Sequence, residues 1–357
     1  MQGKLILKDG SIWEGRSFGA GRPAAGEVVF ATGMVGYPQS FTDPSYEGQI
    51  LVLTYPLVGN YGVPDKKFWE SDRIHISGLV VCNYNATPSH HSSRQSLAQW
   101  LKKEGVPALE IKDTRGLTQK LRQHGVMLGK IVNRGITRNG TRNHAEDNLD
   151  FYDPNQENLV AKVSTKKIIK SGKGKKTVVL IDCGAKRNIV RSLEKRSLNV
   201  ITVPWDYDLG KLKAKFQSVV VSNGPGDPSV NEPTILNIQK LMAKKYPILG
   251  ICLGNQLLAL AAGGKTYKLK FGHRGQNQPC VLKGTKRCFL TTQNHGFAVG
   301  KIPKGFTEWF YNANDNTNEG IIHKKLPWMS VQFHPEATPG PVDTDWIFDE
   351  FLKKAKL

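Results

Sequence analysis

The chain has 357 residues, 39% of them apolar, which excludes a disordered or collagen-like protein and favours two domains with buried cores. Its net charge is +20, but the basic residues are scattered and accompany no nucleic-acid-reading motif, so we expect no nucleic-acid partner. The first residues show no signal-peptide pattern, and the most apolar stretch, 249–264, is too short and too polar to span a membrane. We therefore expect a cytoplasmic protein that has no membrane partner.

The cysteines are odd in number, and no two of them form a CxxC pair. This spacing argues against a disulfide framework and against a structural zinc site. We therefore expect no metal ion, and we expect most of the thiols to be small buried apolar groups. The cysteines are Cys82, Cys183, Cys252, Cys280 and Cys288.

The first part of the chain predicts an α+β domain, residues 1–150, that is rich in short strands. Leu5 and Leu7 alternate with polar residues before the turn signal Asp9-Gly10, which predicts a β-hairpin. Helix signals follow, with capping residues in front and a glycine behind. Further strands are predicted at 27–30, 49–55 and 127–132, and helices at 96–104 and 114–123.

A polar, lysine-rich stretch, 151–176, is interpreted as a linker, and a second domain is predicted at 177–357. In this domain, short apolar strands alternate with amphipathic helices, which is typical of an α/β fold with a mainly parallel sheet covered by helices. Ligand sites in such folds lie at the carboxyl ends of the strands. Strands are predicted at 177–182, 199–203, 217–221 and 247–252, and helices at 186–196, 233–244 and 253–262.

Cys252 lies at the junction of a predicted strand and a predicted helix, between Gly250 and Gly254. The Gly-x-Cys-x-Gly spacing matches the nucleophile elbow usually built around serine, because small residues two positions away let the chain turn sharply. The helix points its amino end at Cys252, which favours a thiolate, and the N–H of Leu253 lies where an oxyanion would develop. The alternative is a buried structural cysteine between glycines that pack a helix.

A cysteine hydrolase also needs a base and a group that orients the base. Residues 329–335 are interpreted as a strand, and residues two apart on a strand face the same side. His334 and Glu336 are therefore predicted to project together, with the imidazole as the base and the carboxylate as its orienting partner. The alternative is a surface histidine beside a solvated glutamate.

Two further segments complete the candidate site. Residues 222–228, SNGPGDP, follow a predicted strand, and their glycines permit close backbone approach to a ligand, with Gly226 as a second oxyanion donor. Residues 293–297, QNHGF, are interpreted as a polar loop suited to a small polar substrate. The alternatives are a plain surface turn for the first segment and a hairpin turn for the second.

Together and in this order, the segments SNGPGDP, GICLGNQ and QFHPE resemble the signature segments of class I glutamine amidotransferases. Further runs are similar to the small chains of carbamoyl-phosphate synthetases: GAKRNIVRSL, KTYKLKFGHRGQNQP and QNHGFAV, with GEVVFATGMVGYPQSFTDPSY and DTRGLTQKLRQHG in the first domain. The resemblance covers essentially the whole chain. It implies an α/β glutaminase domain with the catalytic triad Cys252, His334 and Glu336.

The resemblance also implies a glutamine site to which the first domain contributes through Ser45. One position departs from the family pattern, since the residue after Gly254 is usually histidine and is Asn255 here. Because Cys252 is retained, we still expect glutaminase activity. The implied glutamine-binding residues are Ser45, Gly224, Gly226, Leu253, Gln256, Asn294, Gly296 and Phe297.

The family further implies that this chain holds no cofactor of its own. A separate large synthetase chain would use ATP, Mg²⁺ and bicarbonate to convert the ammonia into carbamoyl phosphate for arginine or pyrimidine biosynthesis, in a heterodimer or a higher assembly. Two alternatives stay open. One is a catalytically silent scaffold for ammonia-dependent synthesis, which Asn255 favours, and the other is the glutaminase of another synthetase, which the first domain argues against.

Overall fold

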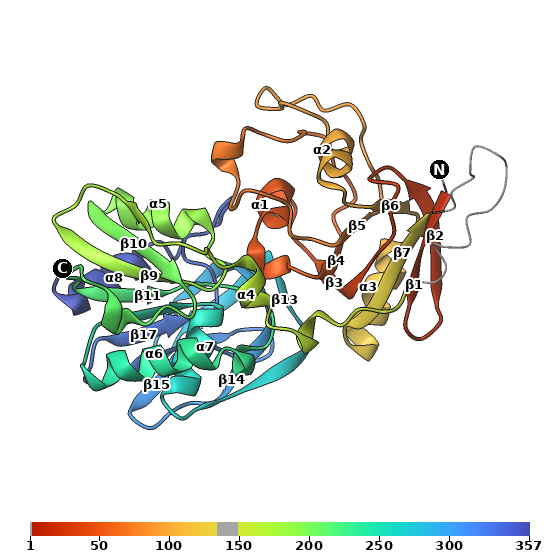
Figure 1. Cartoon of the computed structure of the whole chain (residues 1–357). Coiled ribbons are helices and arrows are strands. Elements are labelled where there is room, and N and C mark those ends of the chain that lie inside the picture. Colours follow the sequence, from red (N-terminus) through yellow and green to blue (C-terminus); the bar gives the residue numbers. More distant parts are fainter. Residues whose placement is uncertain (1, 134–148) are drawn as a thin grey trace. The chain divides into compact units, whose positions relative to one another are not determined.

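Two units make up the chain, Met1–Gln156 and Glu157–Leu357. The computed structural model describes residues 2–133 and 149–357, and Figure 1 labels most of their helices and strands. Among these residues, no helix combines the length and the apolar composition that crossing a bilayer requires.

The first unit is built on a closed barrel of short strands in the order β1-β2-β6-β5-β4-β3-β7. The predicted hairpin is confirmed, because Leu5 pairs with Trp13 and Ile6 pairs with Ile12 across a tight turn. The ladder between β7 and β1 closes the barrel, and β3 to β6 run parallel, which local strand patterns cannot predict. The strands are β1 (Gln2–Leu7), β2 (Ile12–Ser17), β3 (Ala24–Ala31), β4 (Gln49–Leu53), β5 (Gly78–Val81), β6 (Ala108–Ile111) and β7 (Met127–Asn133).

The longer helices of this unit confirm the capping signals of the sequence. Helix α2 begins after Ser96, whose hydroxyl accepts from the Gln99 N–H while the Gln99 side chain accepts from the Ser96 N–H. Helix α3 begins after Asp113 and ends at Gly125. Trp100 of α2 is fully buried in the core of the unit. The helices are α1 (Tyr37–Phe41), α2 (Leu97–Glu104) and α3 (Thr114–His124).

The second unit is a sheet in the order β14-β13-β15-β16-β17-β12-β11-β9-β10-β8, drawn from green to blue in Figure 1. The central strands β17, β12, β11, β9 and β10 run parallel, whereas the outer ladders are antiparallel. The predicted alternation of strands and helices is confirmed. The strands are β8 (Ile169–Ser171), β9 (Lys176–Asp182), β10 (Leu198–Pro204), β11 (Ser218–Val221), β12 (Ile248–Ile251), β13 (Lys265–Leu282), β14 (Cys288–Lys301), β15 (Phe306–Asn312), β16 (Asn318–His323) and β17 (Trp328–Val331). The helices are α4 (Leu159–Val163), α5 (Arg187–Lys195), α6 (Glu232–Ala243), α7 (Leu253–Ala261) and α8 (Trp346–Ala355).

Both faces of this sheet are covered by helices. Val179 and Ile181 of β9 join a core that includes α6 and α7, whereas Val178 and Leu180 join a core that includes α5 and α8. Because successive residues point to opposite faces and both faces are buried, the central strands are apolar on both sides. The parallel strands β9, β11 and β12 end at one edge of the sheet, and this edge carries the nucleophile segment.

Two segments differ from the sequence-based expectation. The stretch expected as a linker, 151–176, contains α4 and the edge strand β8, which pairs with β10. The stretch expected as a polar loop, 293–297, lies inside β14, which pairs with β13 in a long antiparallel hairpin. The side chains of Gln293, Asn294 and His295 are buried. Their polar character therefore reflects internal hydrogen bonds rather than contact with solvent.

Candidate active site

A strained turn connects β12 to α7 and carries Cys252. This residue has φ 55° and ψ −104°, a combination that non-glycine residues rarely adopt. The glycines around it are required by space, because a Cβ on Gly250 would lie 2.3 Å from the Gly254 carbonyl oxygen. A Cβ on Gly254 would lie 2.2 Å from the Val221 carbonyl oxygen. The structure thus confirms the sharp strand-to-helix turn that the glycine spacing predicts.

The sulfur of Cys252 is buried, and its polar neighbours come from three residues, Asn294, Gln332 and His334. It contacts the carbonyl oxygen of Asn294 at 3.6 Å, and Nε2 of Gln332 donates towards it at 3.8 Å. The backbone N–H of Cys252 donates to the Val331 carbonyl oxygen at 2.8 Å, which ties the turn to β17. The sulfur lies at the amino end of α7, where the helix dipole has its partial positive charge.

A buried line of polar groups runs from His334 to Lys186. His334 Nδ1 contacts Glu336 Oε1 at 2.7 Å, and the same oxygen lies 3.1 Å from Lys186 Nζ. The Asn188 amide donates to the backbone carbonyl of Glu336. The other ring nitrogen, His334 Nε2, is buried, and the Cys252 side chain lies close enough to the imidazole to raise its pKa. His334 Nε2 is therefore the nitrogen available for proton transfer.

Charges within this line set the protonation of its members. Burial alone would raise the pKa of Glu336, but the charges of Lys186 and His334 outweigh burial and hold this pKa below its usual value. Burial alone would lower the pKa of His334, but the charges of Glu336 and Cys252 outweigh it and hold this pKa above its usual value. The site therefore favours an ionised carboxylate beside an imidazolium.

His334 and Glu336 lie beyond the end of β17, which stops at Val331, so they do not share one face of a strand. A turn brings them together instead. The His334 N–H donates to the Thr292 carbonyl oxygen at 2.9 Å, and the His334 carbonyl oxygen accepts from the Ala337 N–H at 3.2 Å. The prediction that the two side chains meet is confirmed, whereas the strand geometry given as its reason is wrong.

Asn255 is fully buried, and both ends of its amide form hydrogen bonds. Its Nδ2 donates to Gln332 Oε1 at 3.1 Å, and its Oδ1 accepts from the Ser330 hydroxyl at 2.8 Å. Gln256 Nε2 donates to the same Gln332 oxygen at 3.1 Å. Because Gln332 Oε1 accepts both bonds, its Nε2 is directed at the sulfur of Cys252. Asn255 thus positions the amide that contacts the candidate nucleophile.

The SNGPGDP segment after β11 closely approaches the nucleophile turn. A Cβ on Gly224 would lie 2.1 Å from a backbone carbonyl oxygen and 2.8 Å from the Leu253 side chain, so a larger residue does not fit there. Gly226 adopts φ +82°, in the left-handed region that favours glycine. The Gly254 N–H donates to the Ser222 carbonyl oxygen at 3.1 Å, which fixes the loop to the turn.

Strand β14 carries three of the predicted glutamine-binding residues, Asn294, Gly296 and Phe297. The Asn294 carbonyl oxygen contacts the sulfur of Cys252, and the Phe297 carbonyl oxygen accepts from Gln256 Nε2 at 2.8 Å. Strand β14 therefore contacts both Cys252 and α7, the helix that follows Cys252. The roles of these residues in glutamine binding stay predictions.

Ser45 is the predicted glutamine-binding residue that belongs to the first unit. It is buried in the 3-10 turn Pro44–Tyr46, and its N–H donates to Asp43 Oδ1 at 2.9 Å. Its contact with glutamine also stays a prediction.

Sequence reasoning does not identify Lys186 or Gln332, although each contacts a predicted catalytic side chain. Lys186 is placed where a site residue is expected, between the carboxyl end of β9 and the start of α5. Gln332 precedes His334 by two residues in the QFHPE segment. The end of a parallel strand for Lys186 and the QFHPE segment for Gln332 are signals that could have identified both residues as candidates. Their contacts could not be predicted, because they depend on the fold.

Each of the two units matches a known protein family. Residues 179–354 match the family described as "Glutamine amidotransferase class-I", and residues 5–131 match "Carbamoyl-phosphate synthase small chain, CPSase domain". A solved structure of a glutamine amidotransferase from Thermotoga maritima aligns with a TM-score of 0.39 and 21% identity. That alignment covers 52% of this chain and 87% of the other.

Individual proteins match over nearly the whole chain. The arginine-specific small chain of carbamoyl phosphate synthase from Neurospora crassa is 45% identical over 99% of this chain and 80% of its own length. The multifunctional protein CAD of Squalus acanthias is 49% identical over 99% of this chain and 16% of its own length. Human mitochondrial carbamoyl-phosphate synthase [ammonia] is 45% identical over 99% of this chain and 24% of its own length. The chain thus spans a quarter or less of such larger relatives.

Proposed function

The chain belongs to the small-chain family of carbamoyl-phosphate synthases and contains a class I glutamine amidotransferase domain, and on this premise we propose that it hydrolyses L-glutamine to glutamate and ammonia. The observation that carries the proposal is the arrangement of three side chains. Cys252 lies on a strained turn at the amino end of a helix, and His334 is held by the buried carboxylate of Glu336. The Cys252 side chain in turn interacts with His334 and raises its pKa.

In the first step, the Cys252 thiolate attacks the side-chain carboxamide carbon of glutamine. The backbone N–H groups of Leu253 and Gly226 would stabilise the oxyanion. When the tetrahedral intermediate collapses, the C–N bond breaks and His334 Nε2 gives its proton to the leaving nitrogen, which departs as ammonia. A γ-glutamyl thioester remains on Cys252, and His334 is left neutral.

In the second step, neutral His334 takes a proton from water, and the resulting hydroxide attacks the thioester carbon. The C–S bond breaks, the thiolate and imidazolium are restored, and the new carboxyl group loses its proton to solvent as glutamate leaves. Glu336, itself paired with Lys186, holds the imidazole in place and stabilises its charged form in both steps. The raised pKa of His334 supports the imidazolium as the starting state.

The family assignment also supports a partner. We propose that a large synthetase chain receives the ammonia and makes carbamoyl phosphate with bicarbonate, ATP and Mg²⁺. The small-chain domain match over residues 5–131 favours this partner over the synthetases of other amidotransferases. Glutamine itself would contact Ser45, Gly224, Gly226, Leu253, Gln256, Asn294, Gly296 and Phe297.

Acid-quench trapping tests the mechanism. The purified chain is mixed with radiolabelled glutamine, quenched in acid, and analysed for label attached to protein. We expect label on Cys252 in the wild type, none in Cys252→Ser, and an unchanged amount in Cys288→Ser, the matched control on an exposed thiol. With the large chain added, Cys252→Ser should still support synthesis from free ammonia.

Two outcomes would contradict the proposal. If Cys252→Ser hydrolyses glutamine at the wild-type rate, Cys252 is not the nucleophile. If the wild type hydrolyses no glutamine alone or with the large chain, yet supports ammonia-dependent synthesis, the chain is a silent scaffold.

A further inference from the structure

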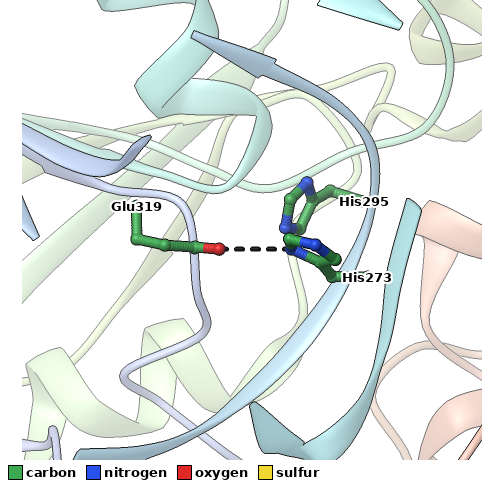
Figure 2. A group of neighbouring side chains, drawn as sticks. All are labelled: His273, His295 and Glu319. Carbon is green, nitrogen blue, oxygen red and sulfur yellow. Dashed lines mark hydrogen bonds and ion pairs between the residues drawn. The ribbon is translucent and has the colours of Figure 1, made fainter. Parts of the chain in front are cut away.

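A second buried polar cluster lies in the same unit, formed by His273 on β13, His295 on β14 and Glu319 on β16 (Figure 2). Each side chain offers one ligand atom, and these atoms all lie within 4.8 Å of one another. We propose that this cluster binds a divalent transition-metal ion of the zinc type. Two imidazoles and one carboxylate are a ligand set that zinc accepts, and the cysteine pattern of the sequence gives no indication of it.

Both imidazoles direct one nitrogen towards an acceptor at the edge of the cluster. His273 Nε2 lies 2.8 Å from Asp315 Oδ2, and His295 Nδ1 lies 2.8 Å from the Phe297 carbonyl oxygen. A ring N–H fixed by a carboxylate or a carbonyl leaves a lone pair on the opposite nitrogen, as in metal-ligating histidines. A bound cation would therefore meet lone pairs on His273 Nδ1 and His295 Nε2.

The amide of Gln293 also favours a cation. Its Nε2 donates to Thr291 Oγ1 at 3.1 Å, and the Thr291 hydroxyl itself donates to the Gln278 carbonyl oxygen at 2.8 Å. This pattern fixes the amide orientation and turns Gln293 Oε1 towards His295 Nε2, 3.0 Å away. An amide oxygen repels a lone pair unless a proton or a cation lies between them.

The spacing of the cluster and the unpartnered second oxygen of Glu319 also fit a metal ion, although Glu319 Oε1 already accepts from Asn312 Nδ2 at 3.2 Å. His273 Nδ1 and Glu319 Oε1 are 3.2 Å apart. Two ligand atoms at about 2.0–2.1 Å from a tetrahedral zinc ion are about 3.3 Å apart, so the ion fits between them with little movement. The other carboxylate oxygen, Glu319 Oε2, is buried and has no hydrogen-bond partner among the described residues. Such an oxygen is costly to bury, and a divalent cation would neutralise it.

The cluster is one side chain away from solvent. Asp315, whose carboxylate contacts His273, has a side chain that is 41% exposed. The bound ion would join β13, β14 and β16, and its binding does not require glutamine hydrolysis. The competing explanation is a metal-free network in which a proton lies between His273 Nδ1 and Glu319.

Zinc binding to the full chain tests the proposal. Because Cys252 and His334 could themselves hold zinc, the measurements use the Cys252→Ser chain after treatment with a chelator. We expect one zinc ion per chain to be retained through gel filtration, with its affinity measured against a chromogenic chelator. Glu319→Gln should abolish retention, and Asp315→Asn should weaken affinity roughly 10- to 100-fold. His323→Asn, a change on the same strand but outside the cluster, should retain the ion.

The zinc-loaded Cys252→Ser protein gives a second measurement that does not depend on the folding of a ligand variant. X-ray absorption at the zinc edge should give two imidazoles and only nitrogen and oxygen ligands. Absence of retained zinc, equal affinity in Glu319→Gln, or sulfur in the metal shell would each overturn the proposal. None of these outcomes bears on glutamine hydrolysis, which the Cys252 trapping experiment tests separately.

Discussion

Replacing Gln332 by glutamate would place a negative charge beside the candidate nucleophile. Gln332 Nε2 lies 3.8 Å from the sulfur of Cys252, while Gln332 Oε1 accepts from Asn255 and Gln256. A glutamate has nearly the same shape and keeps an accepting oxygen, so the change is mainly electrostatic. Two like charges about 4 Å apart repel by about 4 kcal/mol at an effective dielectric constant of about 20. Gln332→Glu should therefore slow glutamine hydrolysis about 1,000-fold.

The uncharged variant Gln332→Met separates the added charge from the lost hydrogen bond. A hydrogen bond to a charged group contributes about 1.5–3 kcal/mol, so Gln332→Met should be slowed about 10- to 150-fold. The assay measures glutamate release at saturating glutamine, and circular dichroism confirms that both variants are folded. A Gln332→Glu rate within tenfold of the wild type, or one faster than Gln332→Met, would refute the electrostatic reasoning.

Three further predictions follow from the packing of the site. Gly254→Ala should lower the free energy of unfolding by about 1–3 kcal/mol in denaturant titration, because its Cβ would lie 2.2 Å from a carbonyl oxygen, whereas Gly21→Ala, with open space around it, should not. Lys186→Met breaks the buried pair with Glu336 and should lower the free energy of unfolding by about 3–5 kcal/mol at neutral pH. Because the folded pKa of Glu336 is lowered, this difference should shrink as pH falls below the usual value of 4.5, and a pH-independent difference would contradict it. Asn255→His should change glutamine turnover by less than about tenfold, about 1.4 kcal/mol in barrier, and restored activity from an inert wild type would contradict that.

The central sheet of the second unit could be predicted because its signals are local. Runs such as 177–182 are apolar on both sides and alternate with helices that have one apolar face, so the positions of these strands and helices follow from short segments. The hairpin of β13 and β14 could not be predicted in this way. Its residues are largely polar, and the alternation that normally marks a strand is hidden because the buried side contains histidine, asparagine and glutamine.

The candidate site was predictable where glycine spacing and adjacent residues determine the geometry, as at Cys252 and at the pair His334 and Glu336. Lys186 and Gln332 were not, because their contacts join residues 150 and 80 positions apart in the sequence. A buried lysine is stable only beside an opposite charge, and its partner is defined by the folded sheet rather than by any local pattern. Sequence motifs thus indicate the candidate catalytic groups, and the fold determines which groups hold them in place.

Asn255 is a residue whose meaning for activity differs between the sequence and the structure. From the sequence it is a departure from the usual histidine and an argument for a silent scaffold. In the structure its amide accepts from Ser330 and donates to Gln332, and Gln332 in turn donates towards the sulfur of Cys252. The buried amide of Asn255 is satisfied at both ends by these hydrogen bonds. Asn255 therefore adds no desolvation penalty beside Cys252. The geometry around Asn255 therefore supports glutamine hydrolysis. The rate of glutamate release in the Gln332 variants measures how strongly Cys252 depends on the hydrogen bonds that link it, through Gln332, to Asn255.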